Sequence, residues 1–229
     1  PNTPGQLRMA WALAYQLLGY PARFPKYLAL SFDDGPNTVT TPKVLDILEE
    51  NGVPASFFVC GKNIDKSTAK VMRRALQLGC DIENHSFSHS HISRLSEEQI
   101  RDEVGRTDAL IEKYTGSAPR FFRPPYIDHN ELMHKTIGHT FICGVGADDW
   151  KKDVDAATRA RLILDNVKDG DIILLHDFEG NDATVEALKT VIPELKSRGF
   201  EFVTVPQLFD QVRGTVPATH NGQIYTNVY

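Results

Sequence analysis

The stretch Leu28-Ala29-Leu30-Ser31-Phe32-Asp33-Asp34-Gly35-Pro36 decides the fold that we expect for this chain. It is typical of a buried strand that ends in two carboxylates and a glycine-proline breaker. Because neighbouring side chains on a strand point to opposite faces, Asp33 and Asp34 can serve one site only if the chain leaves strand geometry there, a departure that Gly35 and Pro36 favour. In such a site one carboxylate can hold a metal ion while the other accepts a proton. A turn that only closes the strand explains the run equally well.

The composition predicts one α/β domain with an uncharged or weakly charged substrate. The chain has 229 residues, of which 41% are hydrophobic, enough for a single good-sized core. Its formal net charge is −5 and it contains no run of lysine or arginine, which argues against a nucleic acid or an anionic membrane as partner. No apolar run approaches the ~20 residues that a membrane helix needs.

We expect three parts along the chain. Residues 1–26 form an extension with a packing helix over 6–20, whose Trp11 and Tyr15 belong to a core rather than to a sugar platform. Residues 27–213 form the catalytic domain, and the polar residues 214–229 form a tail or linker. The start of the chain resembles the end of a linker, which fits a secreted or cell-surface protein whose signal was removed, or a module of a larger enzyme.

Strands and helices alternate throughout the expected domain. After the opening strand, apolar runs bounded by turn residues predict strands at 55–60, 80–83, 121–122, 140–143, 171–175 and 200–203. Helical spacing and capping residues predict helices at 41–51, 66–78, 96–114, 130–137, 155–167, 183–198 and 206–212. Such a series implies right-handed crossovers and a parallel sheet. We therefore predict a TIM-like (β/α) barrel of about seven strands, which can be incomplete.

The three cysteines add little to this prediction. Cys60, Cys80 and Cys143 are too few and too scattered for a disulfide scaffold or a zinc cluster. Each lies in or beside an apolar run, where a free thiol behaves as a small buried hydrophobe. A Cys60–Cys80 bridge is the alternative.

Polar segments follow five of the strands, where a parallel barrel places its active site. These segments are Asp33-Asp34, His85–His89, Phe122–Tyr126, Asp148–Trp150 and the end of Ile172–Asp177. His85 and His89 would share a face on a helical turn, and two imidazoles with one carboxylate form a facial ligand set with open positions for water. Each segment taken alone also has a purely structural explanation, such as surface histidines, an ion pair at a strand end or a residue that caps a strand. The occurrence of all five polar segments after strands of one β/α series favours a metallohydrolase.

In this order the segments resemble the motifs of the polysaccharide deacetylases, carbohydrate esterase family 4, over about residues 27–212. The matching motifs are Ser31–Pro36, His85–His89, Arg123–Tyr126, Asp149-Trp150 and Ile172–His176. The resemblance implies a distorted barrel and one divalent metal ion, usually zinc with cobalt, nickel or manganese as alternatives. It implies that the metal is held by Asp34, His85 and His89.

The resemblance also implies roles for the other residues. Asp33 would be the general base, oriented by Arg123, and His176 the general acid, tethered by Asp149. The backbone N–H of Tyr126 would help to bind the oxyanion. Trp150 and Leu174 would wall the acetyl methyl pocket, and we expect Pro125 to contact the substrate as well.

This chain departs from the family pattern in two places. Gly146 stands where the family often has an aspartate, so an outer contact is either missing or supplied by Asp148. Ile127-Asp128-His129 follows Tyr126, where many members have glycine, which should reshape the rim.

The leading hypothesis is a metal-dependent deacetylase of a cell-wall polysaccharide, most like the members that deacetylate xylan. N-deacetylation of chitin oligomers or peptidoglycan is the alternative within the family. A non-catalytic sugar-binding barrel is the alternative from another class, although every proposed ligand, base and acid is present. A glycosidase would need two acids about 5–9.5 Å apart across a long cleft, and a serine esterase would need a G-x-S-x-G elbow, which the sequence lacks.

Overall fold

The fold was analysed in a computed structural model, which describes residues 14, 26–212, 214 and 219–228. The helix predicted over 6–20, with Trp11 and Tyr15, lies outside the described residues apart from Ala14. No helix of the described residues is both long and apolar enough to span a membrane.

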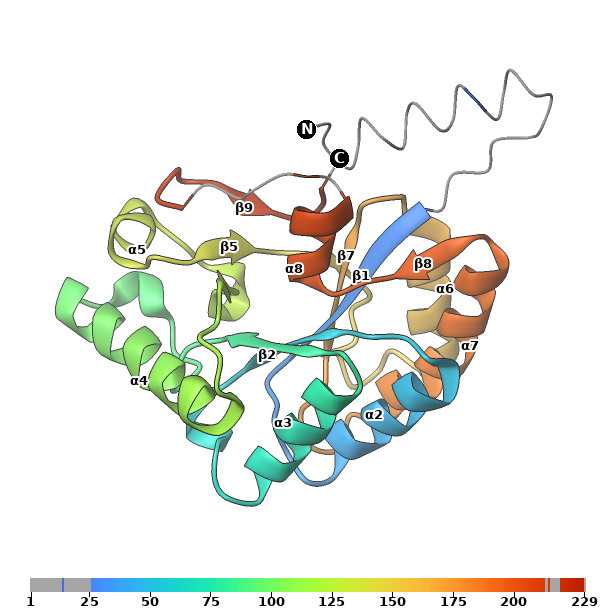
Figure 1. Ribbon diagram of the computed structural model, residues 1–229, viewed down its shortest axis with the longest axis horizontal. Coiled ribbons are helices and arrows are strands. Elements are labelled where there is room, and N and C mark those ends of the chain that lie inside the picture. The colour runs from blue at the N-terminus through green and yellow to red at the C-terminus, as the bar shows by residue number, and fades with distance from the viewer. Residues whose placement is uncertain (1–13, 15–25, 213, 215–218, 229) are drawn as a thin grey trace.

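Among the described residues, nine strands form one parallel sheet, and most of the helices lie outside it (Figure 1). The strands are β1 (Lys26–Asp33), β2 (Ser56–Val59), β3 (Asp81–Asn84), β4 (Phe121–Phe122), β5 (Thr140–Ile142), β6 (Val145–Gly146), β7 (Ile172–His176), β8 (Phe200–Phe202) and β9 (Ile224–Tyr225). Their order is β6-β7-β1-β2-β3-β4-β5-β9, with β8 paired to the start of β1. Because β6 and β9 end this path, the barrel is distorted and incomplete, as predicted.

The helices follow the strands as the sequence predicts. They are α2 (Thr40–Asn51), α3 (Thr68–Gln77), α4 (Glu97–Thr115), α5 (Glu131–Thr136), α6 (Ala156–Asn166), α7 (Asp182–Ser197) and α8 (Val205–Gln207), which continues as a π-helix over Leu208–Val212. The predicted capping box is present at the start of α4, where Ser96 and Gln99 satisfy each other's backbone N–H groups.

The described part of the expected tail belongs to the sheet instead. Strand β9 pairs with β5, and Tyr225 accepts a hydrogen bond from the Cys143 N–H at 2.8 Å. The next residue, Thr226, accepts one from the Ile172 N–H at 3.1 Å, and Val228 is buried in the core. Residues 224–228 therefore link β5 to the start of β7 and do not form a linker.

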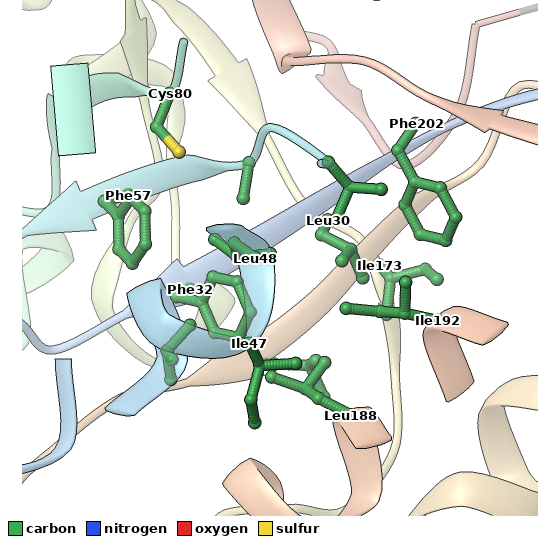
Figure 2. Packing of buried hydrophobic residues seen from close by; sticks show 14 of the residues in the cluster. Leu30, Phe32, Ile47, Leu48, Phe57, Cys80, Ile173, Leu188, Ile192 and Phe202 are labelled. Atoms are coloured by element: carbon green, nitrogen blue, oxygen red, sulfur yellow. The ribbon is translucent and has the colours of Figure 1, made fainter. Parts of the chain in front are cut away.

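The alternation of side chains on β1 separates two of the three hydrophobic clusters of the described residues. Figure 2 shows Leu30 and Phe32 of β1 in the cluster that also includes Ile47 of α2 and Leu188 of α7, beneath the outer helices. Ala29 of β1 belongs to a second cluster, with Phe58 of β2, Ile172 of β7 and the π-helix residues Leu208 and Phe209. By the same alternation Asp33 lies on the Ala29 face of β1, inside the barrel.

Candidate active site

Strands β1 and β7 bring the first two functional side chains together. They are hydrogen-bonded neighbours, and Asp33 at the end of β1 is in register with His176 at the end of β7. Asp34 then leaves strand geometry with a φ of 75°, and its carbonyl accepts a hydrogen bond from Asn63 at 2.8 Å. The departure from the strand that the sequence requires is thus present, and both carboxylates reach one site.

Asp34, His85 and His89 form a group that can hold a metal ion. Their candidate ligand atoms all lie within 4.8 Å of one another. Asp34 Oδ1 is 3.2 Å from His89 Nε2 and 3.6 Å from His85 Nε2. One carboxylate and two imidazoles suit a divalent ion such as zinc, with positions left for water or substrate.

The two histidines meet through a loop and not through the helical turn that would also place them on one face. Ser86 and His89 have positive φ values of 68° and 60°, which no helix contains. Glu103 of α4 holds this loop because its Oε2 accepts hydrogen bonds from the N–H groups of Phe87 and Ser88 at 3.0 and 2.8 Å. A carboxylate far away in sequence therefore sets the loop conformation.

The hydrogen bonds and charges prepare this group for a cation. His85 Nδ1 lies 2.7 Å from the Arg123 carbonyl, which requires a proton on Nδ1 and leaves Nε2 as the free ligand atom. Burial lowers the pKa of His89, which favours the neutral form of the ring that binds a metal ion. Burial alone would raise the pKa of Asp34, but the hydrogen bond and charge of His85, with the charges of His89 and His176, lower it to about 2.

Arg123 follows β4 and points into the barrel, where it is fully buried. Its Nη1 donates to Asp33 Oδ1 at 2.6 Å, and its Nη2 donates to Ser31 Oγ and the Cys143 carbonyl at 2.8 and 2.7 Å. The other oxygen of Asp33, Oδ2, lies 3.7 Å from His85 Nε2 and so faces the metal-binding group. Arg123 thus fixes the Asp33 carboxylate with one oxygen toward the site.

Asp149 holds His176 through both of its oxygens. Oδ1 lies 2.7 Å from His176 Nδ1, and Oδ2 accepts the backbone N–H of His176 at 2.7 Å. Burial alone would lower the pKa of His176, but the hydrogen bond and charge of Asp149, with the charges of Asp33 and Asp34, raise it to about 9. The ring is therefore protonated at neutral pH and can donate from Nε2.

A cavity of about 550 Å³ opens over these groups. Leu174 and the exposed Trp150 line it, as does Tyr126, which has a φ of 61° and stacks on His91 at 4.1 Å between ring centroids. Among the described residues that line the cavity, Pro124 is present and Pro125 is not. Pro125 is buried at the start of a 3₁₀ turn beside this lining, and its contact with the substrate stays a prediction.

The two departures from the family pattern and the three cysteines can also be located in the structure. Asp148 is exposed and its carboxylate accepts from Lys151 Nζ at 2.9 Å, so it does not supply the outer contact considered for it. Gly146 and Ile127 both line the cavity. All three cysteines are free thiols, and burial raises the pKa of Cys60 and Cys80.

The sequence analysis did not predict three buried polar residues that lie behind Asp149. Thr184 Oγ1 donates to Asp149 Oδ2 at 2.9 Å, Asn181 lies beside it, and Arg159 contacts both. The helical spacing in the sequence indicates that two of them, Arg159 and Thr184, lie on buried helix faces. Arg159 lies four residues before buried Ile163, and Thr184 four residues before buried Leu188.

Comparison with known proteins gives concordant relatives. A family model described as polysaccharide deacetylase matches residues 22–142. A bifunctional xylanase/deacetylase of Pseudobutyrivibrio xylanivorans is 42% identical over 203 residues, which cover 89% of this chain but only 33% of that protein. A peptidoglycan-N-acetylglucosamine deacetylase of Bacillus cereus is 37% identical over 188 residues, which cover 80% of this chain and 68% of that protein.

A solved structure agrees with these relatives. A family 4 acetyl xylan esterase from Clostridium thermocellum, in complex with a cobalt ion, has a TM-score of 0.85 and 41% identity, and the match covers 89% of this chain and 99% of that chain. The fold, the relatives and the Asp-His-His group agree. This chain belongs to the polysaccharide deacetylases of carbohydrate esterase family 4, which are hydrolases.

Proposed function

We propose that this protein is a metal-dependent esterase that removes O-acetyl groups from xylan and acts outside the cell or at its surface. One observation carries the proposal. The Asp34, His85 and His89 group lies in one cavity with an arginine-bound carboxylate, Asp33, and a carboxylate-bound histidine, His176.

Asp34, His85 and His89 would hold one divalent ion, with zinc as the expected metal and cobalt, nickel or manganese as alternatives. The fit rests on the compact group and on His85, whose Nδ1 is occupied by a carbonyl so that Nε2 is left for a ligand bond. When bound, the ion supplies Lewis acidity to a water molecule and to the acetyl carbonyl.

The protein's own residues then move the protons. Asp33 accepts the proton of the attacking water through Oδ2, because Arg123 occupies Oδ1. His176 donates a proton from Nε2 to the leaving sugar oxygen, because Asp149 occupies Nδ1. The Tyr126 N–H at the cavity wall assists the developing oxyanion.

The acetyl group would lie between two apolar walls. Trp150 and Leu174 both line the cavity, and their carbon surfaces suit a methyl group. The exposed ring of Trp150 also offers a face to a sugar.

The preference for xylan rests on the relatives. The xylanase/deacetylase and the acetyl xylan esterase are both more than 40% identical to this chain. The much greater length of the xylanase/deacetylase also supports the proposal that this chain is a module of a larger enzyme. The relative from Bacillus cereus favours a second candidate, N-deacetylation of peptidoglycan.

The test is acetate release from acetylated xylan, chitin oligomers and peptidoglycan, measured before chelation, after chelation and after metal is restored. We expect release from xylan that chelation abolishes and metal restores. Release only from the N-acetylated polymers would replace xylan by the second candidate. Unchanged release after complete removal of the metal would refute the metal-dependent mechanism.

A further inference from the structure

Arg159 of α6 is a buried cation behind the site. Only 3% of it is exposed, and it makes four hydrogen bonds. Nη1 donates to Asn181 Oδ1 at 2.6 Å and to Thr184 Oγ1 at 2.9 Å. Nε donates to the Val154 carbonyl at 2.9 Å and Nη2 to the Lys151 carbonyl at 3.0 Å. All four acceptors are neutral oxygens, and two of them belong to Asn181 and Thr184, which both contact Asp149.

The direction of each hydrogen bond follows from Arg159. A guanidinium only donates, so Thr184 Oγ1 must accept from it, and the Thr184 hydroxyl proton is left to donate to Asp149 Oδ2 at 2.9 Å. Asn181 likewise accepts through Oδ1, which turns its Nδ2 toward the His176 carbonyl at 2.8 Å and Asp149 Oδ2 at 3.5 Å. One cation therefore sets the orientation of both neighbours.

The same guanidinium also fixes the segment that follows Asp149. Its bonds to the Lys151 and Val154 carbonyls hold the chain that carries Asp149 and Trp150 against α6. With Thr184 and Asn181 on the other side, the Asp149 carboxylate has one orientation, in which Oδ1 meets His176 Nδ1.

We propose that Arg159 is a positioning residue for His176, acting through Thr184 and Asn181 on Asp149 so that the His176 ring is aimed at the leaving group. This inference rests on the proposed role of His176 as the proton donor.

Thr184→Val tests the inference because it removes the hydroxyl group and keeps the shape of the side chain. We expect kcat on acetylated xylan to fall about tenfold, the equivalent of one hydrogen bond of about 1.4 kcal/mol, with little change in KM. Activity on an aryl acetate, whose phenolate leaves without a proton, should change much less. The Thr184→Ser variant keeps the hydroxyl group and should retain the kcat of the native protein. The Arg159→Lys variant should show the same selective loss as Thr184→Val.

Thr136→Val is the matched control. Thr136 is also buried, and its hydroxyl has no hydrogen-bond partner among the described residues, so this variant should leave both activities unchanged. Equal losses of Thr184→Val on the two substrates, or no rescue by serine, would overturn the inference. His176→Ala in the same assay distinguishes failure of this inference from failure of the proposed function. If His176→Ala loses activity on xylan more than on the aryl acetate and Thr184→Val does not, only the positioning role of Arg159 fails. If His176→Ala is not selective, the proposed role of His176 fails first.

Discussion

Asp149→Asn should remove a pH-dependent part of the stability that comes from His176. In the native protein burial alone would lower the pKa of His176, but the hydrogen bond and charge of Asp149, with smaller contributions from the charges of Asp33 and Asp34, raise it from 6.5 to about 9. A group whose pKa is raised by folding stabilises the native state while it is protonated. The contribution is thus complete below pH 6.5 and is lost as the pH rises through 9.

The magnitude follows from the shift. A rise from 6.5 to about 9 corresponds to about 3 kcal/mol at 1.36 kcal/mol per pKa unit. His176 is only 15% exposed, so solvent screening is limited. Asparagine keeps the size of Asp149 but not its charge, and the charges of Asp33 and Asp34 remain. We therefore expect about 2–3 kcal/mol of the pH-dependent stability to disappear.

The assay is urea unfolding of the native protein and the variant at pH 6 and pH 10. A chelator is present throughout, so that no bound cation adds its own charge near His176. The native protein should exceed Asp149→Asn by about 2–3 kcal/mol more at pH 6 than at pH 10. Other titrating groups cancel in this difference.

Asp148→Asn is the control, because Asp148 is the exposed neighbour that pairs with Lys151. It should leave the pH dependence of stability unchanged. A stability difference between the native protein and Asp149→Asn that is the same at pH 6 and pH 10 would refute the reasoning, since Asp149 would then contribute structure but no charge stabilisation of His176.

Three further substitutions test separate parts of the account. Asp33→Asn should keep the metal and lower kcat by about 100-fold or more, as expected for loss of a general base; loss of metal in proportion to activity would make Asp33 a ligand. His176→Ala should abolish polysaccharide deacetylation but retain activity on an aryl acetate, and equal losses would show that His176 only shapes the site. Gly35→Ala should destabilise the fold by about 1–3 kcal/mol in urea unfolding, because the new Cβ would lie 2.6 Å from Asp177 Oδ2; unchanged stability would show that Asp177 moves freely.

Much of the site could be predicted because its residues stand at strand ends. Alternation along β1 and β7 places Asp33 and His176 on the inner face of the barrel. This alternation follows directly from the positions of the residues in the sequence. The need for Asp34 to leave the strand could also be predicted, since two neighbouring carboxylates cannot otherwise face one site.

Other features depend on contacts between distant segments. The loop of His85 and His89 is held by Glu103 on α4, a contact that the spacing of the two histidines does not reveal. Strands β6 and β9 have two residues each, and their sequence gives no strand pattern apart from their pairing with β7 and β5. Arg159 lies on the buried face of a helix, where sequence patterns predict apolar packing rather than support for an active site.

The most direct test of the central claim is the position of the metal in crystals soaked in Zn²⁺ or Co²⁺, found by anomalous scattering. The account predicts one strong anomalous peak bound by Asp34, His85 and His89. A peak at His91 and Asp128, which pair 3.3 Å apart beside the cavity, or no peak at the Asp34 group after full reconstitution, would contradict it.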